Sequence, residues 1–239
     1  LTVIACIIFA AIKLNKDTEH TLKNTELIPV EDVIITMTNQ GYIKRMTVDT
    51  YRVQRRGGKG ITGAKIKEDD FIEKVMFTST HDTLLFFSNF GRMYKLKAYQ
   101  IPEGSRQAKG TAIINLLPIE KEEKITTVIP LKEYEDDKYL FMATRKGIVK
   151  KTSILDYSNV RKNGLAAINL REDDELISVK KSDGTMEIAV GADNGRMVRF
   201  DETEVRIMGR TASGVRGIDI GDGVAVGMEI SHDNDDVLV

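Results

Sequence analysis

Short apolar runs separated by polar turns recur along the chain and predict an all-β structure. Four five-residue runs are each the length of one strand: residues 33–37 (VIITM), 83–87 (TLLFF), 139–143 (YLFMA) and 187–191 (EIAVG). Each run is followed four residues later by a glycine in a polar setting, namely TNQG, SNFG, TRKG or ADNG. Because glycine readily adopts the positive φ that tight turns need, each run is expected to be the first strand of a hairpin.

The hairpins belong to a longer repeat with a period near 50 residues. The turn glycines are 50, 56 and 48 residues apart, and a second glycine follows each by 17 to 19 residues; the pairs are Gly41 and Gly60, Gly91 and Gly110, Gly147 and Gly164, Gly195 and Gly214. Each second glycine begins another strand-like segment. About four short strands per copy are typical of propeller-like folds, whose blades bury their faces against neighbouring blades. The alternative is a long β-sandwich with accidental hairpin similarity.

A single domain over residues 1–239 is therefore expected, built from four-stranded blades of roughly 50 residues at about 33–80, 83–130, 139–180 and 187–231. Residues 235–239 (DDVLV) look like the first strand of a further blade. Residues 1–24 have two interpretations. They are a closing strand, because residues 9–14 (FAAIKL) are similar to residues 165–170 (LAAINL), or they are a foreign segment. Since the chain begins with Leu rather than Met, it is interpreted as a fragment.

Composition narrows the classes of function. With 41% hydrophobic and 30% charged residues the chain is globular, which excludes collagen, coiled coil and disorder. The lone Cys6 and three scattered histidines offer no disulfide and no metal-ligand spacing, so a cytoplasmic protein without a structural metal is expected. The apolar run at residues 1–12 is shorter than the roughly 20 residues of a membrane helix, so no membrane partner is expected. No catalytic constellation or nucleotide loop is found, which predicts a non-enzymatic chain.

The net charge is only −1, but charge is sorted within the repeat. The four segments from first to second glycine carry +5, +4, +3 and +1 in chain order, and the rest of the chain carries −14. In a blade architecture equivalent segments face the same way, so these cations are expected to form one basic band that attracts a polyanion. The gradient predicts the firmest contact at the first copy. The alternative is that the cations only keep exposed loops soluble.

The most concentrated basic segment is the heptad QRRGGKG at residues 54–60. Its glycines let the backbone approach a phosphodiester chain, to which amide N–H groups and arginine side chains both donate hydrogen bonds. It lacks the GxxxxGK[ST] spacing of a nucleotide-binding loop. The candidate nucleic-acid contacts are the heptad residues Gln54, Arg55, Arg56, Gly57, Gly58, Lys59 and Gly60, with the repeat cations Lys44, Arg45, Lys95, Arg106, Lys109, Lys150, Lys151, Arg161, Lys162, Arg199 and Arg210.

The heptad, the flanking GYIKR at residues 41–45 and the glycine-framed repeat resemble the carboxy-terminal domain of the DNA gyrase A protein, from about residue 24 to the end. The resemblance implies a β-pinwheel, a propeller-like disc whose blades exchange strands. It also implies binding of double-stranded DNA without sequence specificity and wrapping of that DNA around the rim, with the heptad as the wrapping element.

The same resemblance implies partners for this chain and implies that the catalytic groups lie outside it. The partners would be the gyrase B subunit together with the remainder of the gyrase A subunit. The ATP and magnesium used by such a type II topoisomerase, and its DNA-cleaving tyrosine, would lie outside the chain, which is expected to need no cofactor. The related topoisomerase IV domain lacks an intact heptad, so the sequence favours gyrase. A topoisomerase IV-like A-subunit domain and a propeller scaffold for protein partners are the alternatives.

Overall fold

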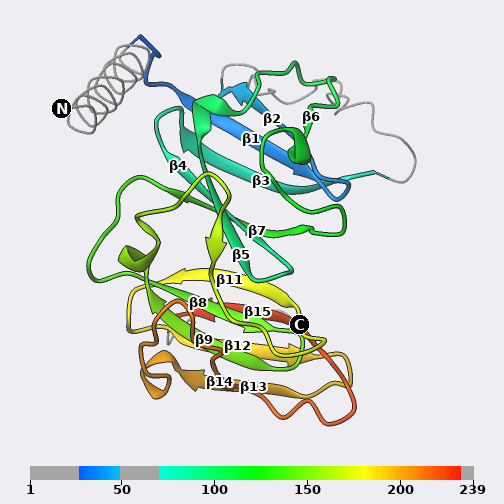
Figure 1. Ribbon diagram of the computed structural model, residues 1–239, viewed down its shortest axis with the longest axis vertical. Helices are drawn as coiled ribbons and strands as arrows, with labels where there is room; N and C mark the ends of the chain where they lie inside the picture. The colour runs from blue at the N-terminus through cyan, green and yellow to red at the C-terminus, as the bar shows by residue number, and fades with distance from the viewer. Residues whose placement is uncertain (1–26, 49–69, 233–239) are drawn as a thin grey trace, which may run out of the picture.

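The computed structural model describes residues 27–48 and 70–232 and contains four antiparallel sheets that follow one another along the chain (Figure 1). Their strand orders are β3-β1-β2-β6, β10-β5-β4-β7, β11-β8-β9-β14 and β13-β12-β15. The bounds are β1 (Asp32–Thr38), β2 (Tyr42–Thr47), β3 (Ile72–Ser79), β4 (Thr83–Ser88), β5 (Arg92–Lys97), β6 (Thr111–Ala112), β7 (Ile125–Leu131), β8 (Tyr139–Thr144), β9 (Ile148–Ser153), β10 (Leu165–Ala166), β11 (Leu176–Ser182), β12 (Glu187–Ala192), β13 (Met197–Asp201), β14 (Val215–Arg216) and β15 (Ala225–Ser231).

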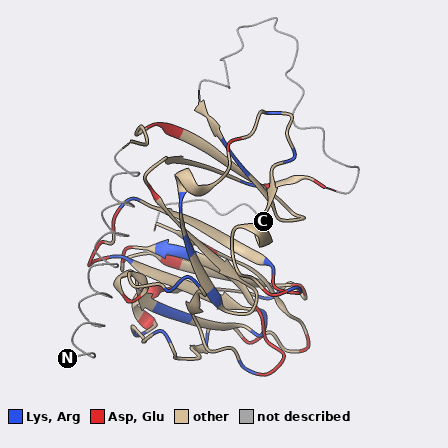
Figure 2. Ribbon diagram, turned by 45° about the horizontal axis from the view of Figure 1, so that its top comes forward, with Lys and Arg blue, Asp and Glu red and all other residues tan. Residues whose placement is uncertain are grey.

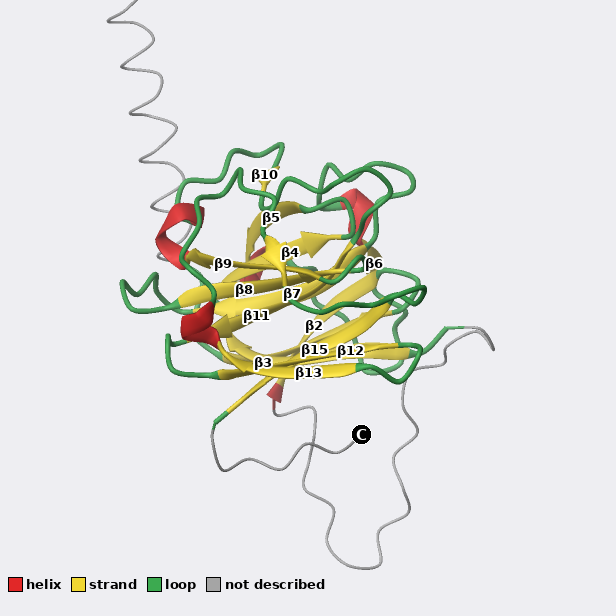
Figure 3. Cartoon of the chain, turned by 90° about the horizontal axis from the view of Figure 1, so that it is seen from below, coloured by secondary structure: helices red, strands yellow, loops and turns green. Residues whose placement is uncertain are grey.

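Short 3-10 turns mark the places where the chain leaves a strand (Figure 3). They are η2 (Ala98–Gln100), η3 (Ile113–Asn115), η4 (Ile154–Tyr157) and η5 (Glu202–Glu204). The four predicted hairpins are confirmed, because β1 pairs with β2, β4 with β5, β8 with β9 and β12 with β13. Each turn glycine has φ between 70° and 81°, as a tight turn between antiparallel strands requires.

Each of the first three sheets takes its outermost strand from the next copy of the repeat. β6 belongs to the second copy but pairs with β2 of the first, while β10 pairs with β5 and β14 with β9 in the same manner. The sheets and the sequence copies therefore do not coincide, because the strand after each second glycine crosses to the preceding sheet. This exchange ties neighbouring blades together, and it is the feature that distinguishes a β-pinwheel from a simple propeller.

The sheets pack face to face, which explains the unbroken apolar runs. Leu84 and Phe86 pack into the core between the first and second sheets, whereas Leu85 and Phe87 pack into the core between the second and third. Since successive residues of a strand point to opposite faces, a strand covered on both sides needs apolar residues at every position. In β8, Leu140 and Met142 pack into the core between the second and third sheets, and Phe141 and Ala143 pack into the core between the third and fourth.

The second glycines of the second and fourth copies, Gly110 and Gly214, allow the donated strand to approach closely. A Cβ on Gly214 would lie 2.5 Å from the carbonyl oxygen of Val149, and one on Gly110 would lie 2.6 Å from that of Ile43. Both glycines also have φ near +90°. Any larger residue would push the incoming chain away from the preceding sheet, so glycine is required at this point of the repeat.

Several expectations concern residues outside the described ranges and stay predictions. They are the closing or foreign segment at residues 1–24, the heptad at residues 54–60 and the further strand at residues 235–239. Within residues 27–48 and 70–232, no helix combines the length and the hydrophobicity that crossing a bilayer demands. The same residues contain no group of three His, Cys, Asp or Glu side chains placed to hold a metal ion.

Candidate nucleic-acid interface

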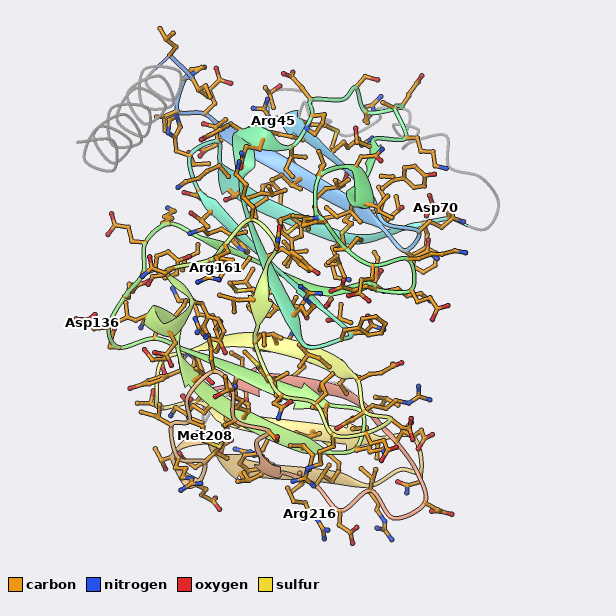
Figure 4. All side chains as sticks on the ribbon, viewed as in Figure 1. Arg45, Asp70, Asp136, Arg161, Met208 and Arg216 are labelled. Carbon is orange, nitrogen blue, oxygen red and sulfur yellow. The ribbon has the colours of Figure 1, made fainter. Side chains whose placement is uncertain are left out.

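Three long loops connect the second strand of a hairpin to the strand donated to the preceding sheet, and we call them rim loops. They span residues 98–110, 154–164 and 202–214, in the second, third and fourth copies. The first of them runs along the outer side of β2, where the Arg45 amide donates to the carbonyl of Pro102 (3.1 Å) and the Gly104 amide donates to that of Arg45 (3.0 Å). Figure 4 places Arg45, Arg161 and Met208 one below another along the same side of the molecule. The rim loops of successive copies therefore follow one side of the stack.

A hollow of about 630 Å³ in this side brings together cations from three copies of the repeat. Lys95 comes from β5, Arg161 from the rim loop of the third copy and Arg210 from that of the fourth. Ser158 and Asn159 add polar groups, and no acidic side chain is among the described residues that line the hollow. Three cations around a polar opening form an environment suited to phosphate oxygens.

The most accessible candidate cations stand on the rim loops. Arg161 and Lys162 are exposed, and Lys109 is exposed with its Nζ 3.6 Å from the centre of the Tyr42 ring. Arg106 and Arg210 are half-buried. Arg199 is exposed on β13 but pairs with the carboxylate of Glu187. The rim loops therefore present charge to solvent, whereas Arg199 is already neutralised by its neighbour.

Three of the predicted contacts, Lys44, Lys150 and Lys151, need correction because their side chains are buried. Lys44 and Lys151 are each 4% exposed, and Lys150 is not exposed at all. They lie on β2 and β9, where the rim loop of the following copy contacts each ammonium group. Figure 2 shows Lys and Arg within strands as well as in loops. These three lysines therefore stabilise contacts between successive copies of the repeat and do not lie on a surface.

Two further candidates, Arg45 and Lys95, are partly committed to main-chain partners. Arg45 Nε donates to the Ile101 carbonyl (3.3 Å), and its side chain is 16% exposed beside Glu103. Lys95 Nζ donates to the Ser158 carbonyl (2.9 Å). Burial, and to a smaller degree the nearby charge of Lys97, lower the pKa of Lys95. Both side chains support rim loops while adding positive potential to the surface.

Two arginines that stand directly after turn glycines, Arg92 and Arg196, were not among the contacts predicted from the sequence. Arg92 donates to the carbonyl of Asn163 in the rim loop of the third copy (3.0 Å) and pairs with Glu120 (3.1 Å). Arg196 donates to the carbonyl of Asp219 (3.0 Å). The sequence signal for these two arginines is a Gly-Arg dipeptide at the turn, which occurs in two of the four copies. This signal is weak, because the partners of the arginines are brought close only by the strand exchange.

The buried Lys150 predicts a specific dependence of stability on pH. Burial lowers its pKa from 10.5 to about 8, with Asp156 opposing and Arg210 reinforcing the shift. Between these values the unfolded chain binds more protons than the folded one, so stability rises with pH. Relative to Lys150→Met, the free energy of unfolding of the wild-type chain is expected to increase by about 2 kcal/mol from pH 7.5 to 9.5.

Urea unfolding of both proteins at the two pH values tests this expectation. The comparison with the methionine variant removes the contributions of other titrating groups, including Tyr94 and Tyr157, whose pKa values burial raises. Parallel pH profiles for the two proteins would show that Lys150 does not titrate in this window.

Comparisons with known proteins agree with this geometry. The family described as "DNA gyrase C-terminal domain, beta-propeller" matches at residues 32–79, 82–132, 138–183 and 187–229. The DNA gyrase A protein of Halalkalibacterium halodurans is 51% identical over 200 residues, which are 84% of this chain and 24% of that protein. The chain thus spans about a quarter of that relative's length.

Two solved structures share the fold. A crystal structure of the C-terminal domain of DNA topoisomerase IV superposes with a TM-score of 0.74 at 30% identity, covering 87% of this chain and 64% of the other. A structure of the DNA gyrase A C-terminal domain superposes with a TM-score of 0.63 at 26% identity, covering 83% of this chain and 64% of the other. The relatedness therefore extends over nearly all of the described sheets.

Proposed function

The chain belongs to the family of DNA gyrase A C-terminal domains, and on that premise we propose that it binds duplex DNA without sequence specificity and bends it around the rim. Such a domain is a non-catalytic part of a type II topoisomerase. We propose that the gyrase B subunit, the remainder of the gyrase A protein, ATP and magnesium supply the chemistry of negative supercoiling, in the cytoplasm and away from membranes.

The observation that carries the proposal is the hollow shared by Lys95, Arg161 and Arg210. Because these cations come from three successive copies, one polymer lying along the rim would meet all of them. Cations in loops bind phosphate oxygens, which are the same for every base sequence, so low specificity follows. Smooth bending of a 20 to 30 base-pair site by 40 to 90° costs on the order of 1 to 6 kcal/mol, which several phosphate contacts offset.

The proposed contacts are the rim-loop cations together with the heptad. Lys109, Arg161 and Lys162 present exposed charge, and Arg106 and Arg210 are half-buried. Arg199 is a weaker candidate because of its pairing with Glu187. In the sequence, the heptad at residues 54–60 falls in the equivalent segment of the first copy, between its two glycines. We propose that it is the strongest of the four contact segments, since that copy carries the largest charge.

A duplex titration at several salt concentrations tests the proposal. With six to ten phosphate contacts, affinity is expected to fall about 10³- to 10⁵-fold between 50 and 200 mM salt, because each neutralised phosphate releases condensed counterions. Nearly constant affinity over this range would contradict binding along the rim. Absence of binding even at low salt would favour the protein-scaffold alternative.

The same titration on closed circular DNA with a nicking-closing enzyme separates wrapping from simple binding. Wrapping is expected to change the linking number in proportion to the bound domain, with the positive hand that the family resemblance implies. Binding that leaves the linking number unchanged would limit the function to DNA attachment.

A further inference from the structure

Two buried lysine ammonium groups lie beneath the rim loop of the following copy. Lys44 on β2 is 4% exposed, and its Nζ lies 3.2 Å from the carbonyl oxygen of Ser105, 2.7 Å from that of Arg106 and 2.8 Å from that of Ala108. All three oxygens belong to the rim loop of the second copy. A single ammonium of the first copy therefore binds three main-chain carbonyls of the second.

Lys150 makes the equivalent contact two copies later. It is fully buried on β9, and its Nζ donates to the carbonyl of Ala167 (2.7 Å) and to that of Arg210 in the rim loop of the fourth copy. Lys44 and Lys150 each stand three residues after a turn glycine. At the intermediate junction Tyr94 occupies this position and donates to Glu123, and the next residue, Lys95, donates to the carbonyl of Ser158 instead.

Packing alone does not explain a lysine at these positions. Burying an ammonium carries a desolvation penalty that an apolar residue of similar volume would avoid. Residues 102–109 form no regular strand or helix apart from an isolated bridge, so carbonyls such as those of Pro102 and Arg106 take donors from outside the loop. The ammonium supplies up to three N–H donors in one place. In both cases one of the carbonyls that the ammonium binds belongs to an arginine of the rim loop, Arg106 or Arg210.

Resting on the proposed function, we propose that Lys44 and Lys150 are positioning residues for DNA binding. They fix the backbone at Arg106 and Arg210, so that these guanidinium groups meet phosphate while the lysines themselves touch no DNA. The first and third copies thereby each set the contact loop of the copy that follows. In both cases the lysine faces inward and holds the backbone of the arginine that faces the rim.

A double-mutant cycle in the full chain tests this coupling. Lys44→Met alone and Arg106→Ala alone are each expected to lower duplex affinity about 8-fold at 0.1 M salt and to reduce the salt slope by about 0.9, the value of one phosphate contact. If Lys44 acts through Arg106, the double variant is also expected to lose only about 8-fold, because the same contact is lost once. A loss of about 60-fold, the additive result, would overturn the proposal, as would unchanged binding of Lys44→Met.

A matched control removes the same charge elsewhere. Lys124 is exposed and lies outside the rim loops, so Lys124→Met is expected to leave the salt slope unchanged. Amide exchange at Gly104 and Ala108 should be faster in Lys44→Met, while the β1–β2 ladder stays protected. Should Lys44→Met fail to fold, Lys150→Met with Arg210→Ala provides the same cycle. A wild-type chain that binds no duplex would refute the proposed function itself, whereas additive losses in a binding chain refute only the positioning role.

Discussion

Replacing Lys109, Arg161, Lys162 and Arg210 together by alanine is expected to weaken duplex binding about 10³- to 10⁴-fold at 0.1 M salt. Each of these cations stands on a rim loop, and each lost phosphate contact reduces the salt slope by about 0.9. Loss of all four therefore lowers the slope by about 3.6, which a titration from 50 to 200 mM salt measures directly. None of the four side chains belongs to a hydrophobic core, so cooperative unfolding should be retained.

The control for this variant removes the same net charge away from the rim. Lys121, Lys124, Lys132 and Arg171 are exposed and lie outside the rim loops. Their replacement by alanine is expected to change the slope by less than about one unit, because they meet no phosphate. Equal losses in the two variants would mean that only net charge matters, which is what the account of the rim cations as solubilising groups predicts.

Replacing Glu202 by glutamine is expected to reduce the free energy of unfolding by about 3 to 5 kcal/mol. Glu202 is fully buried, where it accepts hydrogen bonds from the Ser182 hydroxyl (2.8 Å) and the Met186 amide (2.9 Å) and pairs with Lys151 (3.2 Å). Loss of the Glu202 charge leaves the Lys151 ammonium buried without a counter-charge. The ion pair also links β9 of the third sheet to the segment that follows β13. Chemical denaturation measures the effect.

An exposed ion pair provides the comparison for Glu202. Glu229 pairs with Lys180 at 2.7 Å, but the Glu229 side chain is 67% exposed, so Glu229→Gln is expected to cost less than about 1 kcal/mol. Combining Glu202→Gln with Lys151→Met should recover part of the stability, because the uncompensated charge is removed. A Glu202→Gln variant as stable as Glu229→Gln would show that the buried pair contributes little.

The strands, turns and blade repeat could be predicted because their causes are local. Residues 83–87 are apolar at nearly every position, and the structure buries them on both faces of β4. Gly91 was expected at a tight turn, and it has φ of 70°. Neither inference required knowledge of a distant partner. The charge sorting was equally visible, since the basic segments lie between fixed glycines of each copy.

The sequence by itself determined the hairpins, the four-copy repeat and the family, because turn geometry and strand periodicity are encoded over a few neighbouring residues. Only the tertiary structure decided which cations face solvent. Lys44 and Lys109 are both basic residues of the repeat, yet one is buried under the rim loop of the second copy and the other is exposed on it. The loop that covers Lys44 arrives from about sixty residues further along the chain. Alternation along a strand shows which residues share a face, but it does not show whether a distant loop covers that face. The rim loops, which come from the following copy, therefore decide which of these cations are buried.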